Sequence, residues 1–236
     1  MATIRHPQNA LPRYLQISEF LIREITAGRL TVGQRLAPER EMAVELGVSV
    51  GTLRKALREL EEKGLLERIQ GSGNYIRRND AAESVYAMFR LELIGGGGLP
   101  RADLLHVEEM EKPSDLPEFG VSARGARIRR LRYLNDAIVA LEEIWLDRGA
   151  GVIDPDTLSD SLYRHYSRHL GLRIVRAEDY VAIAEVPEWA PGAFPLSPGA
   201  PAGFVERLSW ADKPAPIEYS RTWFDARSAR YVQRLE

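Results

Sequence analysis

Apolar residues recur at helical spacing in three short stretches of the first third of the chain. The first stretch opens at Pro12 and ends at Gly28, the second covers residues 39–46, and the third follows Ser49 and reaches about Lys63. Their apolar positions are, in order, Tyr14, Ile17, Leu21 and Ile25; Met42, Ala43 and Leu46; and Leu53, Ala56, Leu57 and Leu60. The pattern predicts three helices around a small core.

The second and third predicted helices have the spacing of a helix-turn-helix. Ala43 lies four residues before Gly47, and Leu53 lies six residues after it. Two short helices that cross at a tight turn need a small residue where they approach, a residue tolerant of positive φ at the bend, and an apolar anchor. Ser49 can cap the third helix, because its hydroxyl can accept a bond from a free backbone N–H.

The outer face of the third predicted helix is basic. Gly51, Arg54, Lys55 and Arg58 fall opposite its buried positions. Such a stripe suits the major groove of DNA, because phosphates and guanine edges accept hydrogen bonds. Any one of these side chains could equally well belong to an ordinary solvent-exposed face. Their occurrence together with the helix-turn-helix spacing favours DNA contact.

A glycine-rich turn follows the third helix. The apolar run of residues 65–69 leads through Gln70-Gly71-Ser72-Gly73-Asn74 into Tyr75-Ile76, which predicts strand, turn and strand. Glycines on either side of Ser72 let the backbone come close to a phosphate, as in the wing of a winged helix. We therefore expect Gly71, Ser72 and Gly73 to contact DNA.

Beyond residue 85, alternation with a period of two dominates. It predicts strands over residues 89–93, 127–134, 139–146, 180–186, 204–210 and 217–224. A helix from about Asp160 to Leu170, stopped by Gly171, and a short helix near residues 187–194 interrupt them. This is an α+β pattern with a mainly antiparallel sheet.

Composition narrows the class of protein. The 236 residues carry a formal net charge of −2, but residues 1–80 hold 13 Lys and Arg against 10 Asp and Glu, so DNA binding has to rely on local arrangement. There is no cysteine, which excludes disulfides and thiolate metal sites. No stretch approaches the ~20 apolar residues of a membrane span, and we expect a soluble cytoplasmic protein.

The N-terminal third resembles the GntR family of bacterial transcription factors. The resemblance rests on Arg13-Tyr-Leu-Gln-Ile, on Pro38-Glu-Arg-Glu-Met-Ala, on Gly47-Val-Ser, and on Thr52-Leu-Arg-Lys-Ala-Leu followed by Gly64-Leu-Leu and Gly71-Ser-Gly. It covers residues 12–76 and implies that Arg40, Ser49, Thr52, Arg54 and Gly71 contact DNA. Lys55 and Arg58 join them from the basic face.

Two departures from the family pattern change what is expected. Val50 stands where the family usually has Arg, so one base-reading guanidinium is missing and the operator can differ. Ala37-Pro38 replaces Pro-Ser at the entry to the second helix, which removes a hydroxyl cap worth about 1 kcal/mol.

Four later segments resemble the UTRA domain of the HutC subfamily, which has a chorismate-lyase-like fold. They are Arg130-Leu-Arg-Tyr; Ala140-Leu-Glu-Glu-Ile-Trp-Leu; Ser161-Leu-Tyr with Gly171-Leu-Arg-Ile-Val-Arg; and Pro216-Ile-Glu-Tyr-Ser-Arg-Thr-Trp-Phe. We expect a DNA-binding domain over residues 1–78, a linker over 79–88, and an effector-binding and dimerisation domain over 89–236.

Charged residues on the predicted strands are candidates for an effector site. Arg130 and Arg132 share a strand face and can clamp a carboxylate or phosphate, although an edge strand kept charged for solubility would look the same. Glu142 faces Arg130 if residues 135–137 form a three-residue loop, and the other face if the loop has two residues. Glu218, with Ser220 on its face, is either a ligand acceptor or part of a structural salt bridge.

The subfamily resemblance adds Ser161 and Tyr163 to this pocket, and Arg176 as a further candidate. From the residues alone, Ser161 is equally well a helix cap and Tyr163 a core side chain. His165 and His169 stand four apart, a spacing that can hold zinc, but no third ligand accompanies them and we expect no metal. No cofactor and no catalytic residue are expected.

These observations predict a metabolite-responsive repressor that binds a palindromic operator as a homodimer and is released by a small, anionic effector. Two alternatives remain open. The C-terminal pocket can belong to a lyase-like enzyme, although no nucleophile with its base is evident. The protein can also be a DNA-binding protein that ignores ligands, in which case no metabolite stabilises it against heat.

Overall fold

The structure, a computed structural model, describes residues 11–79, 86 and 88–234. Its described residues form two compact units. A helical unit contains residues 11–79, 86, 88–90, 95–99 and 232–234, and a sheet unit contains residues 91–94 and 100–231. Most of the expected linker, residues 79–88, lies outside the described residues.

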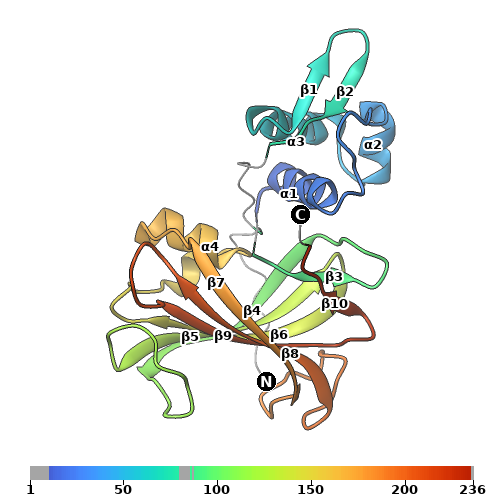
Figure 1. The fold of residues 1–236 in the computed structure, drawn as a ribbon. Helices are drawn as coiled ribbons and strands as arrows, with labels where there is room; N and C mark the ends of the chain where they lie inside the picture. The colour runs from blue at the N-terminus through green and yellow to red at the C-terminus, as the bar shows by residue number, and fades with distance from the viewer. Residues whose placement is uncertain (1–10, 80–85, 87, 235–236) are drawn as a thin grey trace. The chain divides into compact units, whose positions relative to one another are not determined.

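The helical unit contains the three predicted helices (Figure 1). They are α1 (Arg13–Thr26), α2 (Glu39–Glu45) and α3 (Val50–Glu62). The buried face of α3, Leu53, Ala56, Leu57 and Leu60, packs against residues of α1 and α2 in one apolar core. Gly47 takes a φ of 61° at the bend between α2 and α3, as the helix-turn-helix spacing requires.

A two-stranded hairpin follows α3. β1 (Leu66–Ile69) pairs antiparallel with β2 (Gly73–Ile76), with Ile69 opposite Gly73 at the tip. Leu65, Leu66 and Ile76 join the apolar core of the helices, so the base of the hairpin is fixed while its tip extends outward. This is a wing.

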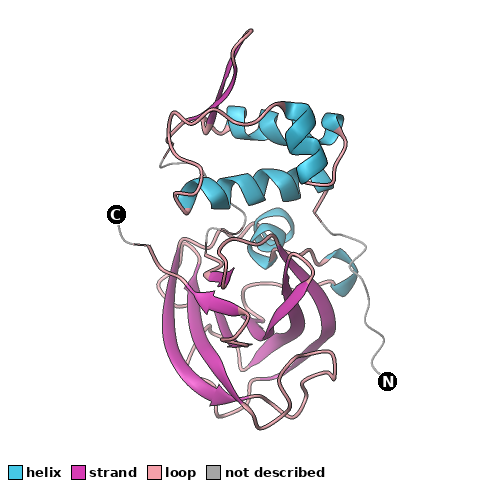
Figure 2. Ribbon diagram, turned by 90° about the vertical axis from the view of Figure 1, so that its right-hand side faces the viewer, coloured by secondary structure: helices cyan, strands magenta, loops and turns pink. Residues whose placement is uncertain are grey.

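The sheet unit is built on one antiparallel sheet of six strands in the order β4-β5-β6-β9-β8-β7. Figure 2 shows these strands curving around the interior of the unit. The strands are β4 (Pro100–Glu111), β5 (Arg124–Leu134), β6 (Ala137–Asp147), β7 (Arg176–Glu185), β8 (Pro201–Trp210) and β9 (Glu218–Phe224). Two short strands, β3 (Leu91–Leu93) and β10 (Ala229–Tyr231), pair with each other.

A helical segment packs on one face of the sheet. It consists of a turn of 3₁₀ helix, η1 (Pro155–Thr157), then α4 (Leu162–His165), which continues into a π-helix, η2 (Tyr166–Leu170). Tyr166 is fully buried in a core with Ile128 and Ile144 of the sheet. Gly171 ends the segment with a φ of 65°, as predicted.

The β5–β6 hairpin settles the register that the sequence left open. Its loop has two residues, since Leu134 pairs with Ala137, but a bulge after Arg132 shifts the register by one. Glu142 therefore lies directly opposite Arg130. The bulge shifts the strand register by one residue, as a three-residue loop would have done.

One expected element is absent from the described residues, and one strand was not expected. Residues 187–194 form turns and no helix, because Pro187, Pro191 and Gly192 interrupt helical hydrogen bonding. β4 was not predicted, since a bulge between Leu104 and His106 breaks its alternation. Within the described residues, no helix is long and apolar enough to cross a membrane.

Candidate nucleic-acid interface and ligand pocket

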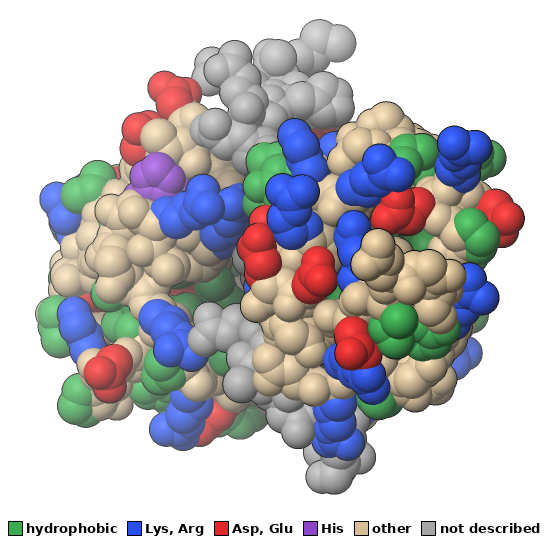
Figure 3. Space-filling view, turned by 90° about the horizontal axis from the view of Figure 1, so that it is seen from above, with side chains coloured by type: hydrophobic (Ala, Val, Ile, Leu, Met, Phe, Trp, Pro, Cys, Tyr) green, Lys and Arg blue, Asp and Glu red, His purple; other side chains and the backbone are tan. Residues whose placement is uncertain are grey.

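The outer face of α3 is exposed, as its sequence predicts. Arg54, Lys55 and Arg58 are all solvent-exposed, opposite the buried leucines. In the part of the chain that the structure describes, Lys55 and Arg58 take part in no ion pair. Their charges are therefore available to an external anion. Basic side chains (blue) are spread over the face that Figure 3 shows, with acidic ones between them.

Arg54 is oriented by a carboxylate on the preceding helix. Its Nε donates to Glu39 Oε2 at 2.6 Å, while its side chain remains 62% exposed. The other oxygen of Glu39 lies 4.0 Å from Arg68 Nη2, on the wing. Glu39 thus lies between α3 and the wing, and the terminal amino groups of Arg54 form no hydrogen bond within the described residues.

The N-terminus of α3 is capped as expected. The Ser49 hydroxyl accepts a hydrogen bond from the Thr52 amide at 3.1 Å and lies 2.9 Å from the Thr52 hydroxyl. Both residues keep some exposure at the start of the basic face. By contrast, Pro38 precedes α2 without any side-chain cap, which agrees with the loss of the family's serine. Arg40, in the first turn of α2, is exposed.

Glycines shape the tip of the wing. Gly71 has a φ of +75° with open space around it, which leaves the backbone accessible. Gly73 has a φ of +133°, and a Cβ there would lie 2.9 Å from Arg35 Nε. The Ser72 hydroxyl lies 2.7 Å from the Tyr75 hydroxyl. Gly73 therefore allows Arg35 to pack across the base of the turn.

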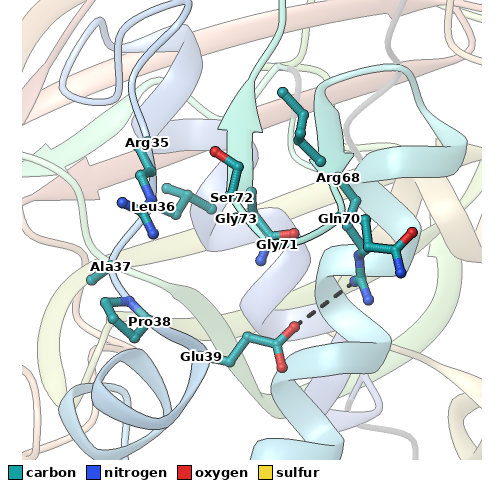
Figure 4. Close-up of a pocket in the computed structure, with 12 residues that line it drawn as sticks. Arg35, Leu36, Ala37, Pro38, Glu39, Arg68, Gln70, Gly71, Ser72 and Gly73 are labelled. Atoms are coloured by element: carbon teal, nitrogen blue, oxygen red, sulfur yellow. Dashed lines mark ion pairs between the residues drawn. The ribbon is translucent and has the colours of Figure 1, made fainter.

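A cleft of about 410 Å³ separates the wing from the start of α2. Figure 4 shows its lining, with Arg35 and the segment before α2 on one side, and Arg68, Gln70 and the wing glycines on the other. Arg35, Arg68 and Gln70 are polar groups that sequence reasoning did not assign to the interface. Arg35 could have been considered from the sequence, because it is a basic residue three positions before Pro38, which precedes the second helix.

In the sheet unit, two buried arginines meet one carboxylate. Arg130 donates to Glu142 Oε2 through Nη2 at 2.6 Å and through Nε at 3.1 Å, and Arg132 Nε lies 3.6 Å from Glu142 Oε1. The Nη1 groups of both arginines donate to the Asp160 carbonyl, at 3.3 and 3.0 Å. Nothing in the sequence pattern pointed to Asp160, because its backbone makes these contacts.

These charges alter the titration of Glu142. Burial by itself would raise the pKa of this carboxyl, but the charges of Arg130 and Arg132 outweigh burial and hold its pKa below the ordinary value. Glu142 is therefore ionised. Arg130 and Arg132 are buried, and a guanidinium in such surroundings can form strong charge-assisted hydrogen bonds with an anion.

A second carboxylate, Glu218, is held in the core of the same sheet face. It accepts hydrogen bonds from the Tyr166 hydroxyl at 2.6 Å and from the Ser209 hydroxyl at 3.0 Å. The Tyr163 hydroxyl lies 2.9 Å from the hydroxyl oxygen of Ser209. Burial raises the pKa of Glu218, although these hydrogen bonds oppose the rise. Burial likewise raises the pKa of Tyr163 and of Tyr166.

Cross-strand register places several of these side chains on one face. Ser220 of β9 lies opposite Arg207 of β8, which lies opposite Asp179 of β7. Arg207 bonds both oxygens of Asp179, at 2.5 and 2.6 Å. The sequence analysis did not name Arg207 as a pocket residue. The alternation of β8 indicates its position, because it puts Arg207 on the same face as Val205 and Ser209.

The structure brings some predicted pocket residues together but not all of them. Arg130, Arg132 and Glu142 form one cluster, while Tyr163 joins the cluster around Glu218. Ser161 caps α4, since its hydroxyl accepts from the Arg164 amide at 3.4 Å. Arg176 lies apart on the other face, because it pairs with Trp210 and stacks on that ring at 4.3 Å.

The two candidate zinc ligands stack on each other. The His165 and His169 ring centroids are 4.6 Å apart, and His165 Nδ1 lies 3.2 Å from the Thr157 carbonyl. Burial and the neighbouring His169 lower the pKa of His165. Among the described residues, no group of three metal-ligating side chains occurs.

A three-helix core with an exposed basic recognition helix and a wing defines a DNA-binding protein of the winged helix-turn-helix class. Residues 13–76 match the bacterial regulatory proteins of the gntR family, and residues 96–230 match the UTRA domain. The chain belongs to the GntR family and has the HutC-like combination of a helix-turn-helix domain with a UTRA domain. It is a transcriptional regulator.

Individual relatives agree with this assignment. The chain is 53% identical over 233 residues to the HTH-type transcriptional regulator SmoD of Agrobacterium fabrum, covering 98% of this chain and 100% of that protein. It is 25% identical over 231 residues to the HTH-type transcriptional repressor NagR of Bacillus subtilis, covering 95% of this chain and 94% of NagR. The crystal structure of the possible transcriptional regulator YydK from Bacillus subtilis has a similar fold, with a TM-score of 0.55, 18% identity and coverage of 96% and 100%.

Proposed function

We propose that this protein is a repressor that binds a palindromic DNA operator as a homodimer in the bacterial cytoplasm, and that a small anionic metabolite releases it. DNA contact is made by Arg40, by Ser49, Thr52, Arg54, Lys55 and Arg58 of the recognition helix and its cap, and by Gly71, Ser72 and Gly73 of the wing. The observation that carries the DNA part is the exposed basic face of α3 beside an accessible wing tip.

The anionic character of the effector rests on charge. Arg130 and Arg132 are buried, with the carboxylate of Glu142 between them. An incoming anion can form charge-assisted hydrogen bonds with both guanidiniums in surroundings where little water competes. Tyr163, Ser161, Glu218 and Ser220 add hydroxyl and carboxylate groups on the same side of the sheet, which suits a polar ligand that also carries hydroxyls.

Control of repression by an effector requires that effector binding and DNA binding are thermodynamically coupled. An effector shifts the equilibrium only if it binds the DNA-incompetent arrangement of the two winged helices better than the competent one. In a symmetric dimer the recognition helices have to reach half-sites about 34 Å apart, or a multiple of that distance. The relative NagR of Bacillus subtilis is named a transcriptional repressor, which supports the direction of control.

The decisive experiment measures DNA binding and its loss. Duplexes selected from a random library by the full chain define the operator, and Arg54→Ala is expected to weaken binding to it by about 1–3 kcal/mol and to relax specificity. Arg124→Ala, which removes the same charge from an exposed site in the sheet unit, is the matched control. Equal binding by the wild type and Arg54→Ala at fixed salt would contradict the assignment of the recognition helix.

The effector is then sought by thermal shift. A library of anionic and neutral metabolites is screened for compounds that stabilise the full chain, and each hit is added to the operator complex. We expect stabilising compounds to be anionic and to dissociate the complex. Hits that are turned over would favour an enzyme, and a library without any hit would favour a ligand-independent DNA-binding protein.

A further inference from the structure

The cleft of about 410 Å³ beside the wing is lined by two guanidiniums that the chain itself uses little. Arg35 takes part in no ion pair and no side-chain hydrogen bond within the described residues. Arg68 has only long contacts, since its guanidinium lies 4.0 Å from carboxylate oxygens of Glu39 and Glu61. Both side chains therefore keep donors for a group from outside the chain.

Asn74, in the second position of β2, lines the same cleft and lacks a partner. It is only 8% exposed, and its side-chain oxygen forms no hydrogen bond within the described residues. A buried polar group without a partner is rare in folded proteins and calls for an explanation such as a ligand. Half a turn about the terminal bond exchanges the amide oxygen with the NH2 group, so this position can present donors as well as an acceptor.

The chemistry of the lining suits an anion with several oxygens. Guanidiniums carry positive charge and donate hydrogen bonds, and the side-chain amides of Gln70 and Asn74 can add donors. Among the described lining residues Glu39 alone is acidic, and Arg54 of α3 donates to it at 2.6 Å. A phosphate group, whose oxygens accept hydrogen bonds in several directions, matches these groups.

The cleft adjoins both elements that the proposed function assigns to DNA. Glu39, in its lining, pairs with Arg54 of α3 and lies 4.0 Å from Arg68 of the wing. When a helix occupies the major groove, the sugar-phosphate strand that borders the groove runs alongside it. A cleft beside α3 is therefore positioned to meet phosphates, whereas the face of α3 meets the base edges.

We propose that this cleft seats one phosphodiester group of the operator, with Arg35 and Arg68 as its charged partners. Asn74 and Gln70 supply further donors. Gly73 belongs to the site, because a Cβ there would lie 2.9 Å from Arg35 Nε and displace the guanidinium. The site rests on the proposed function and adds to it a contact that fixes the position of the protein on the duplex without reading its sequence.

The salt dependence of DNA binding tests this site. Arg35→Ala in the full chain should weaken binding to the selected operator and to a scrambled duplex by the same factor, about tenfold or more, because a charge-assisted hydrogen bond is lost. The slope of log K against log salt should become less steep by about 0.9, the value for one phosphate. Arg124→Ala, which removes the same charge from the sheet unit, should change neither quantity.

Neutral linkages in the DNA locate the phosphate. Operators that carry one methylphosphonate, placed at each linkage in turn, should bind the wild type more weakly when the neutral linkage is the one that enters the cleft. Arg35→Ala should show no further loss at that linkage, because the contact is already missing, but the usual loss at the other linkages. Arg68→Ala should identify the same linkage.

Asn74→Leu separates a binding role from a structural one. Leucine has a similar shape and needs no hydrogen-bond partner, so the variant should unfold at a higher urea concentration than the wild type. It should nevertheless bind the operator and the scrambled duplex more weakly. Lower stability with unchanged DNA binding would mean that the amide serves the fold, and would contradict its place in the site.

The outcomes distinguish this site from the proposed function. If Arg35→Ala keeps the affinity and salt slope of the wild type while Arg54→Ala weakens operator binding, the phosphate site is overturned and the proposed function stands. If Arg54→Ala binds like the wild type while Arg35→Ala binds weakly, the recognition helix is wrongly assigned and the phosphate site stands. Inorganic phosphate that protects the wild type but not Arg35→Ala against heat, with equal DNA binding by both, would assign the cleft to a free anion and overturn the proposal.

Discussion

At the scale of single residues, Glu142 is held by positive charges from two neighbouring side chains. Its carboxylate lies between Arg130 and Arg132, and all three residues are buried. Removing one partner from a buried ionic cluster leaves the others without a counter-charge, which costs more than the net gain of the intact cluster. Glu142 is therefore expected to contribute to the stability of the fold, apart from the role in effector binding that we propose for it.

Glu142→Gln should destabilise the protein by roughly 3–5 kcal/mol at neutral pH, because two buried guanidiniums lose their counter-charge. The pKa of Glu142 is depressed below its ordinary 4.5. Its contribution is therefore complete above pH 4.5 and is lost as the pH falls through the depressed pKa. Urea unfolding of the wild type and variant at several pH values should show the difference shrinking below pH 4.5.

A matched control for this prediction is Glu109→Gln, at an exposed site on β4. It should cost little at any pH, since exposed ion pairs contribute little. A wild-type-to-Glu142→Gln difference that stays constant down to pH 3 would mean that the carboxylate is not held ionised by its neighbours.

At the scale of elements, the wing depends on backbone conformations that few residues can adopt. Gly71 has a positive φ and open surroundings, whereas Gly73 combines a positive φ with the close approach of Arg35. A β-branched residue at a positive φ costs about 1–3 kcal/mol of local strain. The tip can relieve that strain by changing shape, because no core residue packs against it.

Gly71→Val should therefore weaken operator binding while leaving the core of the helical unit folded. Gly199→Val is the matched control, since Gly199 has a φ of +79°, has nothing within 4 Å and lies in a turn of the sheet unit. Both variants carry comparable strain, but only the first alters the wing. A footprint of Gly71→Val identical to that of the wild type would argue against wing contact.

Elements with local signals were predictable from the sequence. α3 begins after the cap at Ser49 and ends one residue before the predicted Lys63, because caps and apolar spacing are local properties. The pairing of Arg130 with Glu142 was not predictable, since it depends on a bulge that no residue type announces. Asp160 was equally hidden, because its backbone carbonyl makes the contacts.

At the scale of the whole molecule, regulation requires that a ligand in the sheet unit alter DNA binding by the helical unit. If the effector releases the operator, as we propose, reciprocity requires that DNA and effector weaken each other's binding by the same factor. Residues of the pocket should therefore change the response to the effector without changing the affinity of the effector-free protein for its operator. Residues of α3 should do the reverse.

Arg132→Ala should abolish release of the operator by a screening hit, because the loss of charge-assisted hydrogen bonds weakens anion binding by about 1.5–3 kcal/mol. Arg129→Ala is the control, since Arg129 lies on the other face of the same strand and pairs with Glu143. Titration of the preformed operator complex measures both. A normal dose-response in Arg132→Ala would remove Arg132 from the pocket.

The contact between Glu39 and Arg54 has a consequence for how tightly ionic strength controls operator binding. A guanidinium already neutralised by its own protein displaces fewer condensed cations when it reaches a phosphate or a base. Affinity should therefore fall less steeply with added potassium chloride than the number of arginines at the groove suggests. Replacing Glu39 with glutamine would make that slope steeper.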